Sequence, residues 1–478
     1  MRLRELLGKY YSDIINDIEV FGVYSDTRIM KPNSVFVCVR GSNEDGHRYA
    51  LRAYELGASV IISDRKLDIP VAVILVDNTK EALIYLTKRF YNGKKPKMVA
   101  ITGTNGKTTT SYMVASIFNE AQKSCAVVGT NGVNFRGVDE IKTAPTTPCI
   151  TELYEIMEGL YKSGVKWAAT ELSSHALEQG RAEGLLIEAG IFTNLTHDHL
   201  DYHKTMENYF KAKRKLFEIC KVRVINADDD YGKRLLEEFD DAVSYGINDG
   251  KIRAYDINMT NEGTSFDLAI EDTRYNVHMK IGGLFNVYNA LGAAGAAFAL
   301  GISPEQIAAG LEKTENVSGR MERIRVGRTD VVIDYAHTPD GLENALKAVK
   351  GFSRGRVIAV FGCGGDRDRK KRPEMARIAT SIADFTVITS DNPRCERPSA
   401  IISDIINGVA SDRYIVIEDR KKAIEAALML ADKDDVILLA GKGQERYQII
   451  GKEKHHFDER EIVAGYTYSE NGIGGLLL

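Results

Sequence analysis

Gly103-Thr104-Asn105-Gly106-Lys107-Thr108-Thr109 is the most informative stretch of this 478-residue chain. An apolar run at residues 98–102 leads into it, and a helical pattern at 111–120 follows. A strand that ends at glycines and restarts as a helix directs backbone N–H groups and the positive end of the helix at one point, which suits a phosphate. Lys107 adds a mobile cation, and the Thr108 hydroxyl can ligate Mg²⁺. We therefore predict that all seven residues bind the triphosphate of ATP.

The match to the nucleotide-binding loop pattern is incomplete. That pattern places a glycine five residues before Gly106, and this chain has Ile101 there. A shorter G-x-x-G-K-T-T loop remains, so an ordinary turn with a surface lysine is the alternative. The strand, the two glycines, the lysine and the hydroxyls together favour the phosphate site.

Length and composition indicate a globular protein of about three domains. The chain is 44% hydrophobic and 27% charged, and its net charge of −4 argues against nucleic acid as the main partner. Six scattered cysteines form no C-x-x-C pair, which is typical of reduced thiols. The N-terminus lacks the apolar core of a signal peptide, and no run approaches roughly 18 apolar residues. We expect a cytoplasmic monomer without membrane contact.

The fold class predicted from the pattern is α/β, in three domains. The pattern of residues 1–95 predicts a small α/β domain, which ends at a basic linker that contains Gly and Pro, residues 92–97. In residues 96–322, strands alternate with helices, which predicts a mostly parallel, P-loop ATPase-like sheet. A second hinge at 318–323 precedes a Rossmann-like domain, residues 323–478. The predicted strands are 35–39, 59–63, 71–76, 125–129, 166–170, 189–193, 222–226, 331–335, 356–361, 385–389, 414–418 and 436–440.

Polar clusters follow the central strands, where ligands bind in such sheets. Glu171 directly follows one strand and is a natural Mg²⁺ ligand, although an acid at a helix N-terminus is the alternative. Residues 197–203 hold three histidines and two aspartates. We favour a Mg²⁺ site that uses one histidine beside carboxylates there, and leave a zinc site or a solvated loop open. The basic stretch 209–217 predicts a helix near phosphates, in which a lysine could be neutralised or even carbamylated.

The C-terminal strand ends carry charge of both signs. No acidic residue stands at the required spacing after a G-x-G-x-x-G, which disfavours NAD. A charged pocket suits a zwitterionic substrate better, and its candidate residues are Arg367, Asp391, Arg394 and Glu445.

Together these stretches resemble the Mur ligase family, ATP-dependent amide-forming ligases of peptidoglycan precursors. The resemblance runs through all three predicted domains and includes G-T-N-G-K-T-T at 103–109, T-E-L-S-S-H-A-L at 170–177, T-N-L-T-x-D-H-L-D-Y-H at 193–203, Asn286 and Asn289, G-R-M-E at 319–322 and D-Y-A-H-T-P-D at 334–340. His197 departs from the residue type expected in that loop. Within the family, S-D-T-R at 25–28, G-C-G-G-D-R-D at 362–368 and D-N-P-R at 391–394 look like the UDP-N-acetylmuramoyl-tripeptide synthetase (MurE-type) branch, which adds meso-diaminopimelate.

The resemblance implies a reaction. ATP would phosphorylate the D-Glu carboxylate of UDP-N-acetylmuramoyl-L-alanyl-D-glutamate, and the amine of a diamino acid would attack the acyl phosphate. It implies that Thr108 and Glu171 hold one Mg²⁺, and that His199 and a carbamylated Lys213 hold a second. Lys107, Glu171, His199 and Lys213 would thus be catalytic. Asn289, Asp334 and Arg320 would contact adenine, ribose and a phosphate, respectively.

The same resemblance implies the two other substrate sites. Ser25 would bind the uridine end, and the muramoyl dipeptide would contact Thr146, Thr147, Ser173, Gln179 and Arg181. Diaminopimelate would contact Arg367, Asp391, Asn392, Arg394, Gly441 and Glu445. Arg394 can form a forked pair with the distal carboxylate that lysine lacks.

Three other interpretations are open. The nearest is the L-lysine-adding version of the same ligase. A sister ligase, of the folylpolyglutamate or D-Ala-D-Ala-adding type, fits D-N-P-R at 391–394 less well. A nucleotide-dependent switch without ligation would not need a second charged domain. For the ligase, we expect the C-terminal domain to move as a rigid body about a hinge near residues 320–330.

Overall fold

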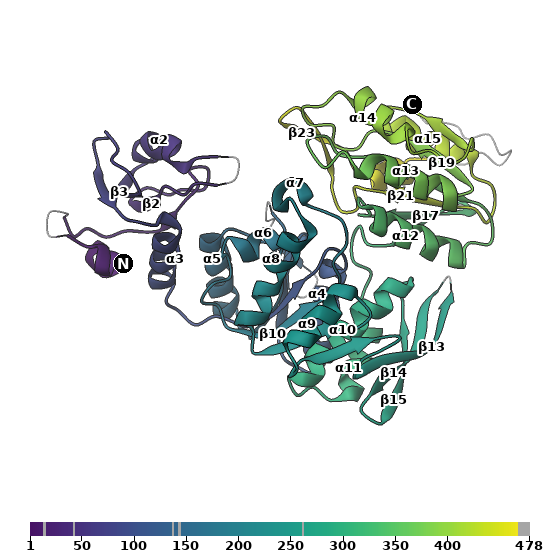
Figure 1. Cartoon of the computed structure of the whole chain (residues 1–478), viewed down its shortest axis with the longest axis horizontal. Helices are drawn as coiled ribbons and strands as arrows, with labels where there is room; N and C mark the ends of the chain where they lie inside the picture. Colours follow the sequence, from purple (N-terminus) through teal and green to yellow (C-terminus); the bar gives the residue numbers. More distant parts are fainter. Residues whose placement is uncertain (13–15, 42–43, 136–137, 142–144, 261, 467–478) are drawn as a thin grey trace. The chain divides into compact units, whose positions relative to one another are not determined.

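The structure is a computed structural model that describes residues 1–12, 16–41, 44–135, 138–141, 145–260 and 262–466 (Figure 1). These residues divide into two compact units, the first of residues 1–97, 147–168 and 175–186 and the second of residues 98–146, 169–174 and 187–478.

The first unit is built on a four-stranded parallel sheet of order β1-β2-β3-β4. Leucines of α1 and α3 pack on its valines and isoleucines, and α5 adds Ile150 and Tyr154 to the same core. The strands are β1 (Val23–Tyr24), β2 (Ser34–Val37), β3 (Ala58–Ser63) and β4 (Ala72–Leu75). The helices are α1 (Leu3–Leu7), α2 (Ala50–Glu55), α3 (Thr79–Phe90), α5 (Ile150–Lys162) and most of α6 (Ser174–Glu178).

The main sheet has 11 described strands in the order β15-β14-β13-β12-β11-β10-β5-β9-β6-β7-β8. Its strands β5, β10, β11 and β12 pair in parallel, whereas β13 to β15 and β6 to β8 form antiparallel hairpins. The strands are β5 (Lys97–Thr102), β6 (Cys125–Gly129), β7 (Gly132–Phe135), β8 (Val138–Ile141), β9 (Trp167–Glu171), β10 (Ile187–Phe192), β11 (Val222–Asn226), β12 (Val243–Gly246), β13 (Ile252–Thr260), β14 (Gly263–Ile270) and β15 (Thr273–Met279).

Helices α4 and α10 are rich in small residues and pack closely together beside this sheet. The helices of this part are α4 (Lys107–Glu120), α7 (Leu200–His203), α8 (Met206–Ile219), α9 (Asp230–Glu238), α10 (Leu284–Ala299) and α11 (Pro304–Glu312).

The C-terminal part holds a six-stranded sheet of order β16-β17-β21-β18-β19-β20, parallel except for the edge strand β16. Apolar clusters cover both of its faces. The strands are β16 (Glu322–Val326), β17 (Thr329–Asp334), β18 (Val357–Phe361), β19 (Phe385–Ile388), β20 (Tyr414–Val416) and β21 (Val436–Ala440), with a hairpin of β22 (Tyr447–Ile450) and β23 (Glu453–His456). The helices are α12 (Pro339–Phe352), α13 (Lys371–Ile382), α14 (Pro398–Ile406), α15 (Arg420–Leu430) and α16 (Glu459–Ala464).

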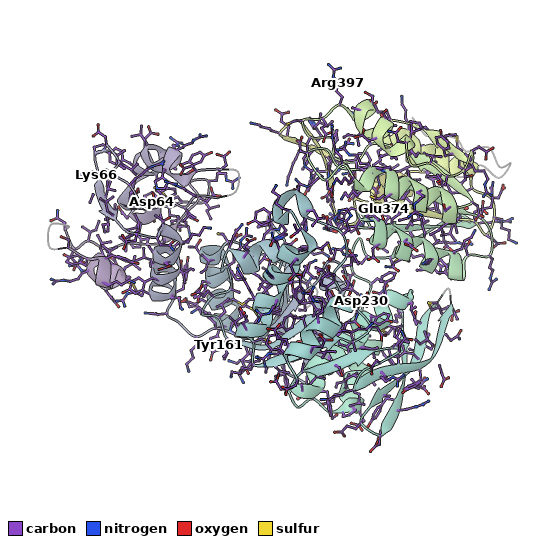
Figure 2. The ribbon with its side chains drawn as sticks, viewed as in Figure 1. Asp64, Lys66, Tyr161, Asp230, Glu374 and Arg397 are labelled. Carbon is purple, nitrogen blue, oxygen red and sulfur yellow. The ribbon has the colours of Figure 1, made fainter. Side chains whose placement is uncertain are left out.

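The predicted α/β fold class is confirmed, and the domain boundaries near residues 95 and 322 stay predictions. Most predicted strands end within two residues of the observed ones, but the antiparallel hairpins of the main sheet were not predicted. Charged side chains such as Lys66, Asp230 and Arg397 are exposed on the surface (Figure 2). None of the described helices combines the length and apolar character of a membrane span.

Candidate active site

The loop from Gly103 to Gly106 joins β5 to α4 and has a shape that only glycine permits at both ends. Gly103 has a φ of +153° and Gly106 a φ of +84°. A Cβ atom would lie 1.8 Å from the Thr193 hydroxyl at Gly103 and 2.2 Å from the Asn289 amide oxygen at Gly106. The loop therefore depends on glycine for its backbone conformation and for close packing. Helix α4 begins at Lys107, four residues earlier than the sequence predicts.

Two lysines converge on the carbonyl oxygen of Gly103. Lys107 Nζ donates to the carbonyls of Gly103 and Thr104, both at 2.8 Å, and Lys213 Nζ donates to Gly103 O at 2.7 Å. Burial lowers the pKa of both side chains, and the Lys107 ammonium lowers that of Lys213 further. Lys213 therefore favours the neutral amine.

Glu171 is the last residue of β9 and is fully buried. Its carboxylate accepts hydrogen bonds from the Thr130 N–H at 2.8 Å, the Thr130 hydroxyl at 2.9 Å and the Thr108 hydroxyl at 3.1 Å. Arg320 Nη2 also donates to the Thr108 hydroxyl, at 2.9 Å. Carboxylate and hydroxyl oxygens are the ligands that Mg²⁺ prefers, so the donors at this position fit that ion.

Asp198 is buried between two histidines. Its Oδ2 lies 3.4 Å from His199 Nε2 and 3.8 Å from His337 Nε2. Burial raises the pKa of Asp198, but the His337 and His199 rings outweigh it and hold that pKa well below its usual range. Asp198 is therefore a carboxylate at neutral pH.

The other two histidines of the 197–203 stretch have separate partners. His203 Nε2 lies 2.9 Å from the Ser174 hydroxyl, and its ring stacks on Tyr209. His197 Nε2 lies 2.9 Å from Asp368 Oδ2 of the C-terminal part. Within the described ranges, no three His, Cys, Asp or Glu side chains form a group that could hold a metal ion, which leaves the zinc interpretation without support.

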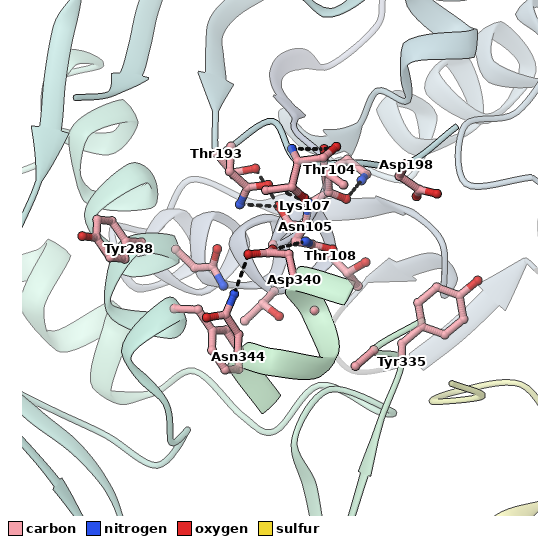
Figure 3. A pocket seen from close by; sticks show the side chains of 18 of the residues that line it. Thr104, Asn105, Lys107, Thr108, Thr193, Asp198, Tyr288, Tyr335, Asp340 and Asn344 are labelled. Carbon is pink, nitrogen blue, oxygen red and sulfur yellow. Dashed lines mark hydrogen bonds between the residues drawn. The ribbon is translucent and has the colours of Figure 1, made fainter. Parts of the chain in front are cut away.

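A pocket of about 400 Å³ opens over the Gly103–Gly106 loop (Figure 3). Thr146 and Ser173 line it, as do the predicted metal ligands Thr108, Glu171, His199 and Lys213. The predicted ATP residues that line it are Thr104, Asn105, Gly106, Lys107, Thr108, Thr109, Asn289, Arg320 and Asp334. Predicted residues spread over the sequence from 104 to 334 thus share one cavity, whereas Gly103 is not among the residues that line it.

Two of the predicted ATP residues reach this pocket from elements after residue 280. Asn289 lies on α10 and donates to Asn286 Oδ1 at 2.9 Å. Asp334 ends β17 and accepts the N–H groups of Met321 at 2.8 Å and Ala336 at 2.9 Å. Burial raises the pKa of Asp334.

Two further residue pairs connect the Gly103–Gly106 loop and its surroundings to the C-terminal part. Asn105 Nδ2 donates to Asp340 Oδ2 at 2.7 Å, near the start of α12 (Figure 3). The Arg320 guanidinium lies 4.6 Å from the centre of the Tyr335 ring.

The predicted diaminopimelate residues form a second cluster at the carboxyl ends of the C-terminal strands. Asn392 Nδ2 donates to Glu445 Oε2 at 2.8 Å, and a Cβ atom at Gly441 would lie 3.4 Å from Asp391 Oδ2. Burial and then the Asp391 carboxylate raise the pKa of Glu445. The cluster therefore gathers carboxylates and an amide at one strand-end position.

Arg394 supplies positive charge to this cluster. Its backbone is in the left-handed region at φ +51°, and its Nη1 donates to Gly365 O at 2.9 Å. Burial and then the nearby Arg367 guanidinium lower the pKa of Arg394. Two neighbouring guanidinium groups would attract a carboxylate.

Ser25, Thr147, Gln179 and Arg181 lie in the first unit. Arg181 donates to Gln179 Oε1 at 2.8 and 3.1 Å and to Thr147 O at 2.5 Å, so these three residues form one group. In the S-D-T-R stretch that includes Ser25, Arg28 pairs with Asp26 at 2.5 Å.

Sequence reasoning missed five residues of these two clusters: Thr130, Asp198, Tyr209, Tyr335 and Lys442. Asp198, Tyr209 and Tyr335 lie inside stretches that the sequence analysis singled out, but their residue types did not identify them there. Lys442 lies between the predicted residues Gly441 and Glu445. Thr130 follows a strand that ends at Gly129, so its position at a strand end was the available signal.

Family models match the chain in three places. The one described as "Mur ligase family, catalytic domain" matches residues 19–91, "Mur ligase middle domain" matches 101–297, and "Mur ligase, glutamate ligase domain" matches 319–443.

Similar proteins span nearly the whole chain. The UDP-N-acetylmuramoyl-L-alanyl-D-glutamate–2,6-diaminopimelate ligase 1 of Clostridium acetobutylicum is 42% identical over 98% of this chain and 99% of its own. The ligase of the same name from Bacillus cereus is 43% identical, over 93% of each chain. A solved structure of a UDP-N-acetylmuramoyl-L-alanyl-D-glutamate–2,6-diaminopimelate ligase is 31% identical over 97% of this chain and 98% of its own, with a TM-score of 0.67.

Proposed function

The chain belongs to the Mur ligase family, and we propose that it uses ATP to join meso-2,6-diaminopimelate to UDP-N-acetylmuramoyl-L-alanyl-D-glutamate in peptidoglycan precursor synthesis. The observation that carries the proposal is the pairing of two sites in the second unit. One is a phosphate-type loop with Lys107, and the other is the charged cluster around Arg394 and Glu445. A ligase of this kind needs a site for ATP and a site for a charged amino acid.

In the proposed reaction, the D-Glu carboxylate attacks the γ-phosphorus of ATP, which forms an acyl phosphate and releases ADP. The free amine of diaminopimelate then attacks the acyl carbon, and the tetrahedral intermediate expels phosphate as the amide forms. Lys107 would neutralise charge on the transferring phosphoryl group from its position on the loop. The helix N-terminus at Lys107 would add backbone N–H donors.

Mg²⁺ would lower the negative charge of the phosphates when bound. Thr108 and Glu171 would hold one ion, which their adjacent oxygens in the same buried position support. His199 and a carbamylated Lys213 would hold a second, and both line the same pocket. Asn289 would contact adenine, Asp334 the ribose and Arg320 a phosphate.

We propose six residues as contacts of the UDP-linked dipeptide. Ser25 would bind the uridine end. Gln179 and Arg181 would meet the muramoyl dipeptide as one hydrogen-bonded group with Thr147. Thr146 and Ser173, which line the ATP pocket, would face the reacting end of the dipeptide.

Selection of the amino acid would rest on Arg394 and Glu445. Arg394 would donate a forked pair of hydrogen bonds to the distal carboxylate of diaminopimelate, and Glu445 would accept a hydrogen bond from the distal ammonium. Arg367, Asp391, Asn392 and Gly441 would complete the site. A site built for a polar group rejects an analogue that lacks it, because its buried groups would then stay unpaired.

Phosphate release from ATP with UDP-N-acetylmuramoyl-L-alanyl-D-glutamate tests the proposal. We expect release with meso-diaminopimelate and little with L-lysine. Arg394→Ala should raise the KM for diaminopimelate by about tenfold or more, the effect of losing a charge-assisted hydrogen bond. The matched control is Arg397→Ala, an exposed arginine three residues away, which should leave that KM within about twofold (Figure 2).

Other results would favour the alternatives. Release with lysine instead would identify the lysine-adding version of the ligase. Release with neither amino acid would favour a sister ligase, to be tested with D-Ala-D-Ala or glutamate as the acceptor. ATP binding without any acceptor-dependent release would favour a nucleotide-dependent switch.

A further inference from the structure

Lys442 is a fully buried lysine at the centre of the diaminopimelate cluster. It follows β21 in the turn between Gly441 and Gly443, and its side chain is 0% exposed. An ammonium group in such a place is costly unless oxygen atoms replace its water. Its partners therefore indicate why the position holds a lysine.

Those partners are mostly the predicted substrate residues. Lys442 Nζ donates to Tyr447 O at 2.8 Å and to Asn392 Oδ1 at 3.0 Å. It also lies 3.3 Å from Asp391 Oδ1 and 3.5 Å from Glu445 Oε2. These oxygen partners hold the ammonium in contact with Asp391, Asn392 and Glu445. Through those three residues it can affect how the amino acid binds.

Lys442 fixes which way the Asn392 amide points. Asn392 Oδ1 accepts from Lys442 Nζ and from the Ile449 N–H at 2.9 Å, so two donors select the oxygen end. The amide nitrogen is then directed to Glu445 Oε2, at 2.8 Å. An amide with only one such donor could turn over, since its two ends have similar shapes.

Lys442 also balances two buried carboxylates. Burial raises the pKa of Asp391, but Lys442 and then Arg420 outweigh it, so the pKa stays below its usual range. The pKa of Glu445 is raised by burial and by Asp391, an effect that Lys442 opposes. Without Lys442, the two acids would compete to hold a proton.

We propose that Lys442 is a positioning residue of the amino-acid site, which holds Asp391, Asn392 and Glu445 in the arrangement that diaminopimelate requires. With Arg367, Arg394 and Arg420, it makes four cations against the three carboxylates of Asp391, Glu445 and Glu459. This excess of positive charge favours an amino acid with a second carboxylate over lysine, whose free form carries a net positive charge. The inference rests on the proposed function and adds a residue that determines its specificity.

The test is Lys442→Met, which keeps length and removes charge, with Lys442→Gln as a second variant that keeps a hydrogen-bond donor. Steady-state phosphate release is measured for ATP, the UDP-linked dipeptide, diaminopimelate and lysine. The matched control is Lys452→Met, the same change at an exposed turn between β22 and β23. Thermal unfolding midpoints show which variants are folded.

We expect the KM for diaminopimelate to rise by about tenfold or more in the variants. The KM values for ATP and the dipeptide should stay within about threefold, and the preference for diaminopimelate over lysine in kcat/KM should fall by about tenfold. Because Lys442 acts through its neighbours, adding Glu445→Gln to either Lys442 variant should cost less than the two single effects combined.

Two failures are distinguishable. If the unchanged protein shows no diaminopimelate-dependent phosphate release, the proposed function fails and this inference falls with it. If the unchanged protein is active and a folded Lys442 variant keeps both its KM for diaminopimelate and its preference over lysine, only the positioning role is overturned. Equal increases in all three KM values would also overturn it, since a general structural role predicts that result.

Discussion

Single side chains explain why the phosphate-type loop tolerates a shortened glycine pattern. The position that usually holds the first glycine is Ile101, which is a buried residue of β5. Gly103 and Gly106 instead provide the close approach, because Thr193 and Asn289 fill the space beside them. The loop therefore has its two essential glycines at its own ends.

Gly106→Ala should impair the use of ATP. The left-handed backbone costs about 1 kcal/mol for a residue with a Cβ atom, and that atom would lie 2.2 Å from Asn289 Oδ1. We expect the KM for ATP to rise by about tenfold or more. A matched control is Gly159→Ala on α5, where a Cβ atom meets nothing within 4 Å. The control should keep its activity, and an unchanged KM for ATP in Gly106→Ala would contradict the role of this loop.

Lys213 should react with carbon dioxide, because burial lowers its pKa and so favours the neutral amine. The amine nitrogen would attack the carbon of CO₂ and lose a proton, which gives a carbamate. We expect protein prepared without CO₂ to lose most of its activity and to regain it with bicarbonate. Lys213→Gln should be inactive under both conditions. Full activity without CO₂, confirmed by an uncarbamylated mass, would contradict the prediction.

Among the secondary-structure elements, α13 is tied to the loop that carries Arg367. Glu396 is the link, since its carboxylate accepts from the Asp366 N–H at 2.6 Å and from Arg372 at 2.8 and 3.0 Å. Arg372 lies on α13 and is fully buried. The Arg372 guanidinium lowers the pKa of Glu396 to about 2, against the opposing effect of burial.

Glu396→Gln should destabilise the protein in a pH-dependent way. A lowered pKa means that the charged carboxylate stabilises the fold above its unfolded pKa of about 4.3. That stabilisation is lost as the pH falls through about 2. We expect the free energy of unfolding of the variant to be lower by roughly 1–3 kcal/mol at pH 7 and to differ by much less near pH 2. Urea unfolding of both proteins at the two pH values measures these free energies. An equal difference between variant and unchanged protein at both pH values would contradict the prediction.

For the whole chain, polar contacts join the C-terminal part to the loop region of the second unit. Three of them are Asn105 with Asp340, Asp198 with His337, and His197 with Asp368. His197 is the residue that departs from the family pattern, and its contact with Asp368 lies one residue from Arg367. All three contacts are polar.

The C-terminal part should move as a rigid body about residues 320–330 when the substrates bind. The acceptor amine must reach the acyl phosphate, and the charged cluster does not line the ATP pocket of this structure. X-ray scattering with a non-hydrolysable ATP analogue, the UDP-linked dipeptide and diaminopimelate should report a smaller radius of gyration than the protein alone. Identical profiles would contradict the movement.

Local pattern was enough to predict the alternating strands, the loop at 103–109 and the residue types at the strand ends. Those features depend on neighbours in the sequence, since an apolar run predicts a buried strand and glycines predict a loop. The same logic failed for the hairpins β13 to β15, where exposed residues alternate with buried ones. The zinc alternative at 197–203 also rested only on the number of histidines and aspartates in that short stretch.

Only the tertiary structure decided which polar side chains meet. The three histidines of one short stretch contact different partners: His199 lies near Asp198, His203 near Ser174 and His197 near Asp368. Lys107 and Lys213 are far apart in the sequence, but both donate to the carbonyl oxygen of Gly103. Lys442 illustrates the same limit, because nothing beside it in the sequence shows that it is buried among Asp391, Asn392 and Glu445. Strand order and helix packing bring distant residues together, and burial then sets their charges.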